Sequence, residues 1–336
     1  MPRAKPTPAA LGDLEPGQYA DFFALLSERT KGTTGEGKPY YRCRFRDARR
    51  AAVFMVWADG GYFEECEASW RVGQIYKLRA VYAEHEKYGP QLDVKAIREA
   101  ADADRADGFD PLAFVERSRF DPDELLAQIH ALVETNVADE PLRTLVLLVL
   151  DRHADALRRA PGSKDRYHPF AGGWAEHTLS VTVSCLFLVE LYRTHYPDLK
   201  PSLNRDLLIA GAVLHDVGRC VEFANDATAE RTVPGHLLGH IVLGRDLVRD
   251  AARDVPDLRP DLLLMLEHLI VSHLAIPEWG SPKLPLIPES LILHHADDLD
   301  AKLEMYARCL TRDTAEGPFT DRDWSLGRQL FKGREV

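Results

Sequence analysis

The segment at residues 204–219, NRDLLIAGAVLHDVGR, constrains the fold more than any other stretch. Its apolar residues recur at the spacing of a buried helix, and the adjacent His215 and Asp216 follow in the last turn of that helix. Gly218 lies where a left-handed glycine would end it. Because neighbouring side chains on a helix diverge by about 100°, this imidazole and carboxylate can hold a metal ion from one side only. The sequence therefore predicts that other segments supply the remaining ligands.

Further histidines and an aspartate lie on other segments with helical periodicity. In chain order, the candidate metal ligands are His177, His215, Asp216, His240, His273 and Asp297. One inward-facing histidine is usually hydrogen-bonded within a core, because a buried imidazole needs a partner. A series of four in this order favours a metal centre instead.

Helical periodicity orients two of these ligands. His240 is predicted to face inward on a stripe with Leu237, Leu243 and Leu247. In the last helix, the predicted buried stripe contains Ile292, Ala296, Leu299, Leu303 and Tyr306. Asp297 and Asp300 lie on one flank of this stripe, whereas Asp298 turns toward solvent. We therefore expect Asp297 to be a metal ligand and Asp300 to support the ligands.

Residues 15–100 have a β pattern instead. Five candidate strands, separated by glycine-containing or charged turns, cover residues 18–29, 39–47, 51–57, 72–83 and 88–98. In the second strand, Tyr41, Cys43 and Phe45 alternate with Tyr40, Arg42, Arg44 and Arg46. Five strands in this length predict a small barrel of the OB-fold type with one aromatic and basic outer face.

An OB-fold binds single-stranded nucleic acid on such a face and with the loops at its edge. The candidate nucleic-acid-binding residues are Lys31, Lys38, Tyr40, Arg42, Arg44, Arg46, Lys87 and Tyr88. Further aromatic residues of the barrel, among them Trp57, are candidate stacking platforms. The alternative is a solvated strand face that is basic by chance.

The whole chain is predicted to be a multidomain protein, a β-barrel followed by an all-α domain. Besides the barrel, the expected parts are a disordered tail at 1–14, an acidic linker at 101–122, a helical bundle at 123–312 and an extension at 313–336. The net charge is −11, but residues 1–105 are nearly neutral, so the acidic excess lies in the helical part.

Composition indicates a protein of the cytoplasm. No run of about 18 apolar residues is present and the start of the sequence lacks a signal-peptide core, so no membrane partner is expected. The five cysteines are scattered and form no CxxC pair, which favours reduced thiols over disulfides or a zinc site.

The ordered histidines and aspartates resemble those of the two-metal HD-domain phosphohydrolases. The segments TKGTTGEGKPY, YHPFAGGWAEHTLSV, LLIAGAVLHDVGR, GHLLGHIVLG, HLIVSHL, EWGSPKLP and LDAK extend the likeness to the YhaM-type 3′-to-5′ exoribonucleases, in which an OB-fold precedes an HD domain. This resemblance implies that His177, His215, Asp216 and Asp297 hold one metal ion. It implies that His240 and His273 hold a second, with Asp216 bridging the two.

The resemblance implies hydrolysis of single-stranded RNA, or of single-stranded DNA, to nucleoside 5′-monophosphates by hydroxide that two metal ions activate. Imidazole-rich ligands suit manganese, iron, cobalt or nickel better than magnesium, and manganese is the first expectation. His168, Arg219 and Lys283 are candidates to bind phosphate or to protonate the leaving oxygen. Arg219 replaces a lysine common after the His-Asp pair, and Ala171 stands where a basic residue is expected.

Two other functions fit the same residues. An HD-type nucleotidase or cyclic-nucleotide phosphodiesterase would use the same metals, although it needs no extended basic surface. A non-catalytic module that grips RNA would have no physical reason to keep several buried histidines.

Overall fold

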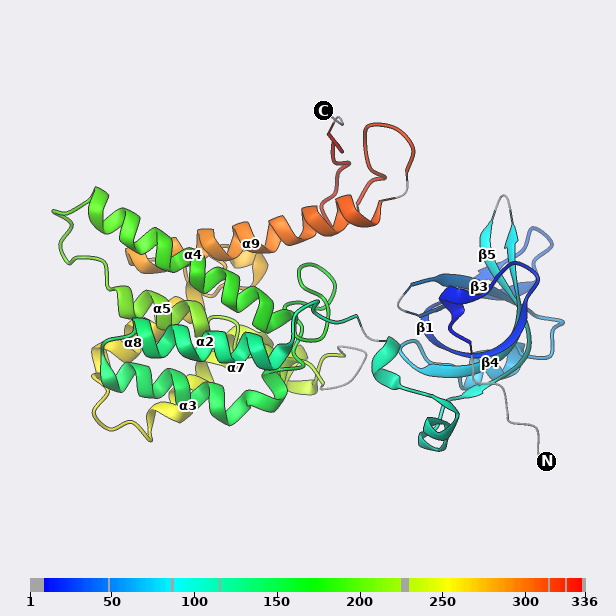
Figure 1. Cartoon of the computed structure of the whole chain (residues 1–336), viewed down its shortest axis with the longest axis horizontal. Coiled ribbons are helices and arrows are strands. Elements are labelled where there is room, and N and C mark those ends of the chain that lie inside the picture. The colour runs from blue at the N-terminus through cyan, green and yellow to red at the C-terminus, as the bar shows by residue number, and fades with distance from the viewer. Residues whose placement is uncertain are drawn as a thin grey trace. The chain divides into compact units, whose positions relative to one another are not determined.

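The structure is a computed structural model that describes residues 9–47, 49–85, 88–114, 116–224, 230–313, 315–323 and 325–333. The chain divides into two compact units, one ending at Glu116 and the other beginning at Arg117 (Figure 1). The first unit is a β-barrel and the second is helical, which confirms the predicted fold class.

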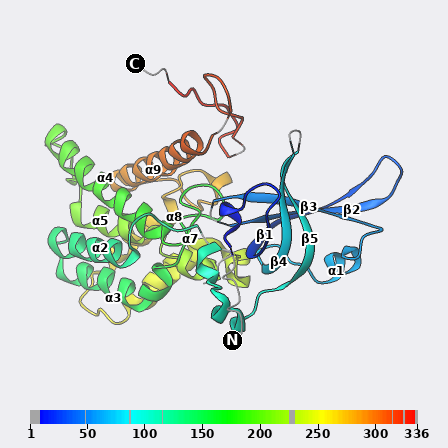
Figure 2. The same cartoon turned by 45° about the vertical axis from the view of Figure 1, so that its right-hand side comes forward.

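Five strands form a closed barrel in the first unit (Figure 2). They are β1 (Tyr19–Thr33), β2 (Pro39–Arg46), β3 (Ala51–Trp57), β4 (Ile75–His85) and β5 (Gly89–Glu99). The strand order is β1-β2-β3-β5-β4, and β1 closes the ring by pairing with β4. The short helix α1 (Phe63–Ala68), which was not predicted, connects β3 to β4. This architecture fits the OB-fold expected from the sequence.

The alternation predicted for β2 is confirmed. Tyr41, Cys43 and Phe45 are buried in the barrel core, whereas Arg42 and Arg44 are exposed. Since successive side chains of a strand point to opposite faces, the arginines lie on the outer face.

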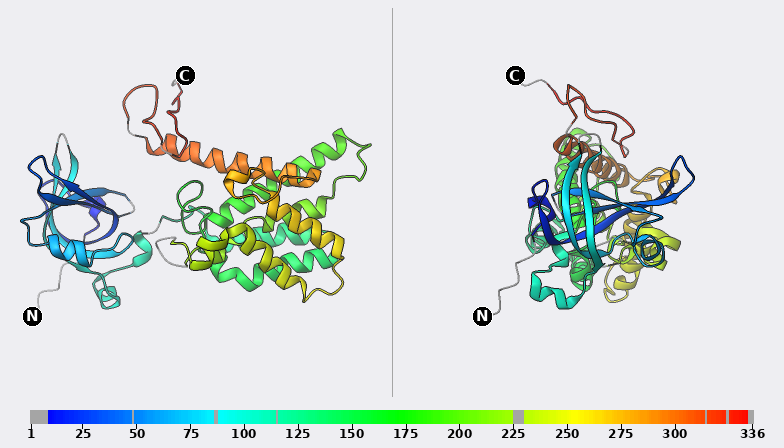
Figure 3. Two further views of the ribbon diagram at one scale, coloured as in Figure 1. Left: turned by 180° about the vertical axis from the view of Figure 1, so that it is seen from behind. Right: turned by 90° about the vertical axis from the view of Figure 1, so that its right-hand side faces the viewer.

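The prediction of a disordered tail is wrong for residues 9–14, and residues 1–8 lie outside the described part of the chain. The 3-10 turn η1 (Leu11–Asp13) and the residue after it place Leu11 and Leu14 in the barrel core, where both are almost fully buried. Figure 3 shows the start of the described chain, in dark blue, at the barrel. The Pro- and Ala-rich composition suggested disorder, but two leucines are enough to anchor this short segment.

Residues 101–114, expected to be part of a linker, pack against the barrel. They contain the 3-10 turns η2 (Asp102–Asp107) and η3 (Pro111–Phe114). Phe109 and Phe114 form a small cluster with Phe23, which lies on β1. Asp104 is buried and accepts hydrogen bonds from Arg98. The acidic composition of this segment therefore gave no indication of its contacts with the barrel.

Helices build the second unit. They are α2 (Pro122–Asn136), α3 (Glu140–Leu157), α4 (Gly173–His195), α5 (Arg205–Leu214), α6 (Arg219–Glu222), α7 (Val233–Ala252), α8 (Pro260–Ser272), the 3-10 turn η4 (Pro277–Trp279) and α9 (Pro288–Arg312). In α5, every residue from Leu207 to Leu214 is buried, as expected of a helix that is apolar on all sides. Helices α3, α4, α8 and α9 all contact it. This central helix ends at His215, so that residue lies in the interior of the bundle.

Gly218 does not adopt the predicted left-handed conformation. Its φ of −62° and ψ of −13° are those of a right-handed turn. The position instead requires a glycine for space, since a Cβ atom there would lie 2.0 Å from the carbonyl oxygen of His240. Gly218 therefore lets the segment after Asp216 approach α7 closely.

Two predicted apolar stripes are only partly correct. Leu237 is exposed, because Gly239 interrupts α7 with a φ of 71°, and Ile241, Gly244 and Val248 form the buried face beyond it. In α9, Ile292 and Ala296 are buried as predicted, but Leu299 and Leu303 are both 58% exposed. The buried face of α9 follows Leu293, Ala296 and Asp297 instead.

The segment after α9 folds back on the end of that helix. Phe319 and Phe331 pair as an isolated β-bridge, Thr320 lies 3.9 Å from Cys309, and Lys332 forms an ion pair with Asp313. Among the described residues, no helix combines the length and apolar character needed to span a bilayer.

Candidate metal centre

Three helix ends and the kink of α7 position four of the predicted ligands. Gly172, with a φ of 81°, begins α4 and places His177 in its second turn. His215 and His273 cap the C-terminal ends of α5 and α8, and His240 follows the kink of α7. The backbone at these ends orients the side chains inward, and His177, His215 and His273 are completely buried.

The first group of donor atoms comes from α4, α5 and α9. Nε2 of His177 lies 3.1 Å from Oδ1 of Asp297, and Nε2 of His215 lies 3.9 Å from the same oxygen. The two Nε2 atoms are 3.4 Å apart. Three potential ligand atoms therefore face one small volume.

The second group surrounds Asp216. Its Oδ1 atom lies 3.1 Å from Nε2 of His240 and 3.6 Å from Nε2 of His273. All three atoms are buried, and none makes a hydrogen bond with a described residue. A carboxylate oxygen of Asp216 also lies within 4.8 Å of a ring nitrogen of His177 and of His215, so Asp216 adjoins both groups. Orphaned polar atoms are costly in a protein interior, and a divalent cation bound among them would satisfy all three.

The other ring nitrogens of these histidines already face acceptors. Nδ1 of His215 lies 2.8 Å from the carbonyl oxygen of Ala212, and Nδ1 of His273 lies 2.7 Å from that of Ile270. Nδ1 of His177 lies 2.6 Å from Asp300. A histidine that donates its Nδ1–H in this way keeps Nε2 as a metal ligand. The residues present therefore fit a divalent metal centre.

Burial and nearby charges shift the pKa values of the candidate ligands. It lowers the pKa of His273 to about 4, reinforced by the nearby His215, so His273 is neutral at pH 7. His177 behaves differently, because Asp297 and Asp300 outweigh the opposing effect of burial and raise its pKa to about 10. Without a metal ion, His177 is thus a cation held between two carboxylates. A metal bound at its Nε2 would replace that proton.

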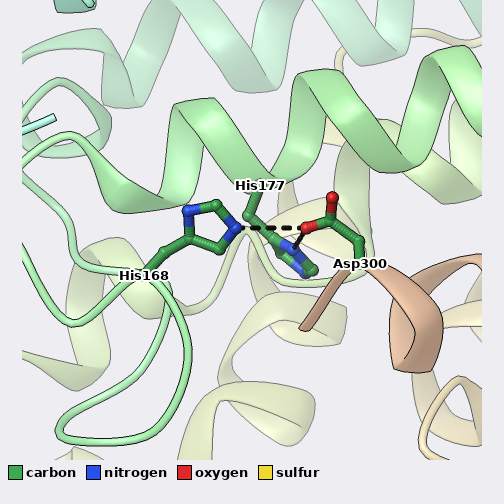
Figure 4. Close-up of side chains that lie close together, drawn as sticks. All are labelled: His168, His177 and Asp300. Carbon is green, nitrogen blue, oxygen red and sulfur yellow. Dashed lines mark hydrogen bonds and ion pairs between the residues drawn. The ribbon is translucent and has the colours of Figure 1, made fainter. Parts of the chain in front are cut away.

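Asp300 contacts Nδ1 of His177, and Asp297 contacts the other ring nitrogen of that histidine. Figure 4 shows Asp300 beside His177 and His168. The Oδ2 atom of Asp300 faces both His177 and Nε2 of His168, at 3.2 Å, and its Oδ1 atom accepts a hydrogen bond of 2.5 Å from Ser180. Burial opposes ionisation of Asp300, but these hydrogen bonds hold its pKa well below the usual value. Asp300 therefore remains a carboxylate that fixes the ring of His177.

Of the three predicted phosphate-binding residues, the structure brings one directly to the centre. Arg219 is buried, and its Nε atom donates to Oδ2 of Asp216 at 3.2 Å. His168 is buried against Asp300, with its backbone at a φ of 40°. Lys283 lies exposed in the segment after η4.

Two residues of the centre were missed by the sequence analysis. The hydroxyl of Tyr167 donates to Oδ2 of Asp216 at 3.1 Å and accepts from Arg219 at 3.0 Å. Glu222, 2% exposed, accepts from Arg219 at 2.7 Å, and its Oε2 atom lies 3.6 Å from Nδ1 of His240. Tyr167 adjoins His168 in the motif, and Glu222 is one helical turn after Arg219, but only the fold brings them to Asp216.

The predicted nucleic-acid-binding residues of the barrel are distributed over its outer face and edges. Arg42 and Arg44 both approach Glu28, at 3.5 and 3.3 Å, and Lys31 forms an ion pair with Glu67. These acidic partners reduce the positive charge of the face.

The other barrel candidates lie as follows. Tyr40 packs on the half-exposed Trp57 at a centroid distance of 5.4 Å. Arg46 approaches Glu116, Lys38 is exposed, and Tyr88 packs on His85. Lys87 lies outside the described residues.

The structure thus combines a closed five-stranded barrel with a helical unit that contains a buried His/Asp cluster. Residues 174–302 match the family model of the HD domain. This match spans all six predicted metal ligands, and it indicates a metal-dependent phosphohydrolase domain at residues 174–302. Tyr167 and His168 precede the matched region.

Proposed function

We propose that this protein is a metal-dependent 3′-to-5′ exoribonuclease that hydrolyses single-stranded RNA to nucleoside 5′-monophosphates. The observation that carries the proposal is the convergence of Oδ1 of Asp216 with Nε2 of His240 and His273, beside the group of His177, His215 and Asp297. The six residues form two adjoining donor groups that share Asp216. Such a pair of groups suits two divalent transition-metal ions, with manganese as the first expectation.

Two such ions would lower the pKa of a water molecule and neutralise the phosphoryl oxygens of a phosphodiester. Residues beside the donor groups hold the candidate metal ligands in position. Tyr167 and Arg219 hold Oδ2 of Asp216, which keeps Oδ1 directed at His240 and His273. Arg219 also adds a fixed positive charge beside the site.

The barrel supports a polymer as the substrate. Tyr40 and Trp57 form an aromatic pair across β2 and β3, and the ring of Tyr40 covers Gly32, where a Cβ atom would lie 2.4 Å from it. Arg42 follows on the same face of β2. Aromatic side chains beside cations are the usual platform for single-stranded nucleic acid.

The test is digestion of single-stranded RNA labelled at its 5′ end, in the presence of manganese, with single-stranded DNA and mononucleotides in parallel. We expect a ladder of products that shortens from the 3′ end and releases nucleoside 5′-monophosphates. The variant Asp216→Ala should be inactive, because both donor groups lose a ligand. Asp298→Ala removes a half-buried carboxylate of α9 that pairs with Lys302, and this variant serves as the matched control and should retain activity.

Other results would reject the proposal in favour of a stated alternative. Hydrolysis of mononucleotides or cyclic nucleotides without cleavage of RNA would identify a nucleotidase or cyclic-nucleotide phosphodiesterase. Retention of RNA and metal without any hydrolysis would identify a binding module.

A further inference from the structure

Two cysteines of the barrel lie in direct contact. Cys43 on β2 and Cys66 on α1 are both fully buried, and their Sγ atoms are 3.6 Å apart. The other three cysteines, all free thiols, are Cys185, Cys220 and Cys309. Because the sequence separates Cys43 from Cys66 without a recognisable motif, only the fold reveals the pair.

We propose that Cys43 and Cys66 are a reversible oxidation site that forms an intramolecular disulfide on exposure to peroxide. The sulfur atoms must approach by about 1.5 Å to reach a bonded separation of about 2.05 Å. One partner belongs to a six-residue helix rather than to the barrel wall. A small movement of α1, with changes of side-chain rotamer, brings the two sulfurs within bonding distance.

The surroundings favour Cys66 as the attacking sulfur. The hydrogen bond from Cys43 lowers the pKa of Cys66, and the nearby charge of Arg29 lowers it further against the effect of burial. Arg29 is fixed there by hydrogen bonds to the carbonyl oxygens of Cys66 and Trp70, at 2.6 and 2.7 Å. The thiolate is the reactive form of cysteine. The pair therefore places a thiol of lowered pKa beside a second thiol that can resolve a sulfenic acid.

The reaction is balanced with hydrogen peroxide as the oxidant. The Cys66 thiolate attacks one peroxide oxygen, the O–O bond breaks, and the departing hydroxide takes up the thiol proton to give water. The sulfur of Cys43 then attacks the sulfenic acid at Cys66, so that an S–S bond forms, the S–O bond breaks, and a second water leaves with the proton of Cys43. Two thiols are oxidised and one peroxide is reduced to two waters.

The disulfide has a local consequence on the barrel surface. Glu67 follows Cys66 on α1, and its carboxylate contacts Lys31 at 2.5 Å and the hydroxyl of Tyr41 at 3.0 Å. A covalent bond at Cys66 ties α1, and with it Glu67, to β2. Closing the loop between the two cysteines also restricts the unfolded chain. The oxidised barrel should therefore be more stable than the reduced barrel.

The test is peptide mapping of the full-length protein after peroxide treatment, denaturation and alkylation of the remaining thiols. We expect one peptide pair that joins Cys43 to Cys66, lighter by two hydrogen atoms than the sum of the reduced peptides and separated by dithiothreitol. Cys185 and Cys220 are the controls. Burial raises the pKa of both thiols, to about 12 for Cys220, so both should be alkylated in full.

A second readout is the melting temperature. Oxidation should raise it by several degrees in the wild type and leave it unchanged in Cys66→Ser and Cys43→Ser. Alkylation of all five thiols after peroxide treatment, a linkage between other cysteines, or a sulfinic acid at Cys66 without a linkage would each overturn the proposal. The wild-type map decides the question even if a serine variant does not fold.

Discussion

At the scale of single residues, the centre depends on how each imidazole is oriented. His215 and His273 face carbonyl oxygens of their own helices, whereas His177 depends on the carboxylate of Asp300. A helix carbonyl cannot be removed by mutation, but a carboxylate can. A substitution of Asp300 is therefore the most direct test of how the orientation of an imidazole affects metal binding.

We predict that Asp300→Asn weakens binding of manganese by about 10–100-fold. The substitution preserves the shape of the side chain but removes the charge that fixes His177. The measurement is a metal titration by calorimetry, with melting temperature as the check on folding. Asp298→Asn is the matched control, because Asp298 pairs with the exposed Lys302 instead. Equal affinities for the two variants would show that Asp300 does not position the ligand.

The candidate ligands could be selected from the sequence because each lies in a short motif on a helix-periodic segment. The structure brings the six side chains into two adjoining groups. Tyr167 and Glu222 could not be predicted, because their roles depend on the distance between α6, α7 and the loop before α4. Spacing along a chain carries no information on such distances.

At the scale of elements, the local sequence pattern predicted where strands and helices occur better than it predicted which of their faces are buried. The bounds of the five strands follow the prediction closely. The prediction of the buried face of α7 was partly wrong, because Gly239 interrupts the helical periodicity on which it was based. The segment at 101–114 was mistaken for a linker because its contacts with the barrel come from a buried acid and two separate phenylalanines, without a periodic apolar stripe.

That buried acid allows a prediction for the element η2. The hydrogen bonds from Arg98 hold the pKa of Asp104 well below its usual value, with further hydrogen bonds from the backbone and from Lys77, against the opposing effect of burial. A folded-state pKa below the unfolded value of about 3.9 stabilises the fold at neutral pH, and this stabilisation is lost as pH falls through the folded-state pKa.

We therefore predict that Asp104→Asn lowers the free energy of unfolding at pH 7, and that its difference from wild type shrinks as the pH falls below about 4. Denaturant unfolding at several pH values measures this difference. Asp102→Asn is the control, because Asp102 is almost fully exposed and pairs with Arg105 at the surface. A difference that is independent of pH would contradict an ionic anchor.

At the scale of the whole molecule, we expect the two units to have separate functions. We propose that the barrel binds nucleic acid with its aromatic and basic residues and that the helical unit holds the metal ions. The sequence predicted this division because β and helical patterns occupy separate parts of the chain. It did not predict the acidic partners of the arginines, since Glu28 approaches Arg42 and Arg44 only through strand pairing.

We predict that Trp57→Ala weakens the binding of single-stranded RNA by about 1–3 kcal/mol per stacked base. The KM for RNA should rise, while hydrolysis of a small phosphodiester such as bis-p-nitrophenyl phosphate should not change. Tyr19→Ala is the control, because Tyr19 is an exposed aromatic residue on β1, away from the β2–β3 face. An unchanged KM for RNA would remove the barrel from the binding surface.

The central claim is that six residues hold two divalent metal ions around a shared aspartate. The most direct measurement is the metal content of the protein after saturation with manganese and removal of the unbound metal, determined by elemental mass spectrometry. The wild type should retain two ions per chain, and the double variant His240→Ala/His273→Ala should retain one, held by His177, His215, Asp216 and Asp297. A single ion in the wild type, or two in the double variant, would contradict the claim.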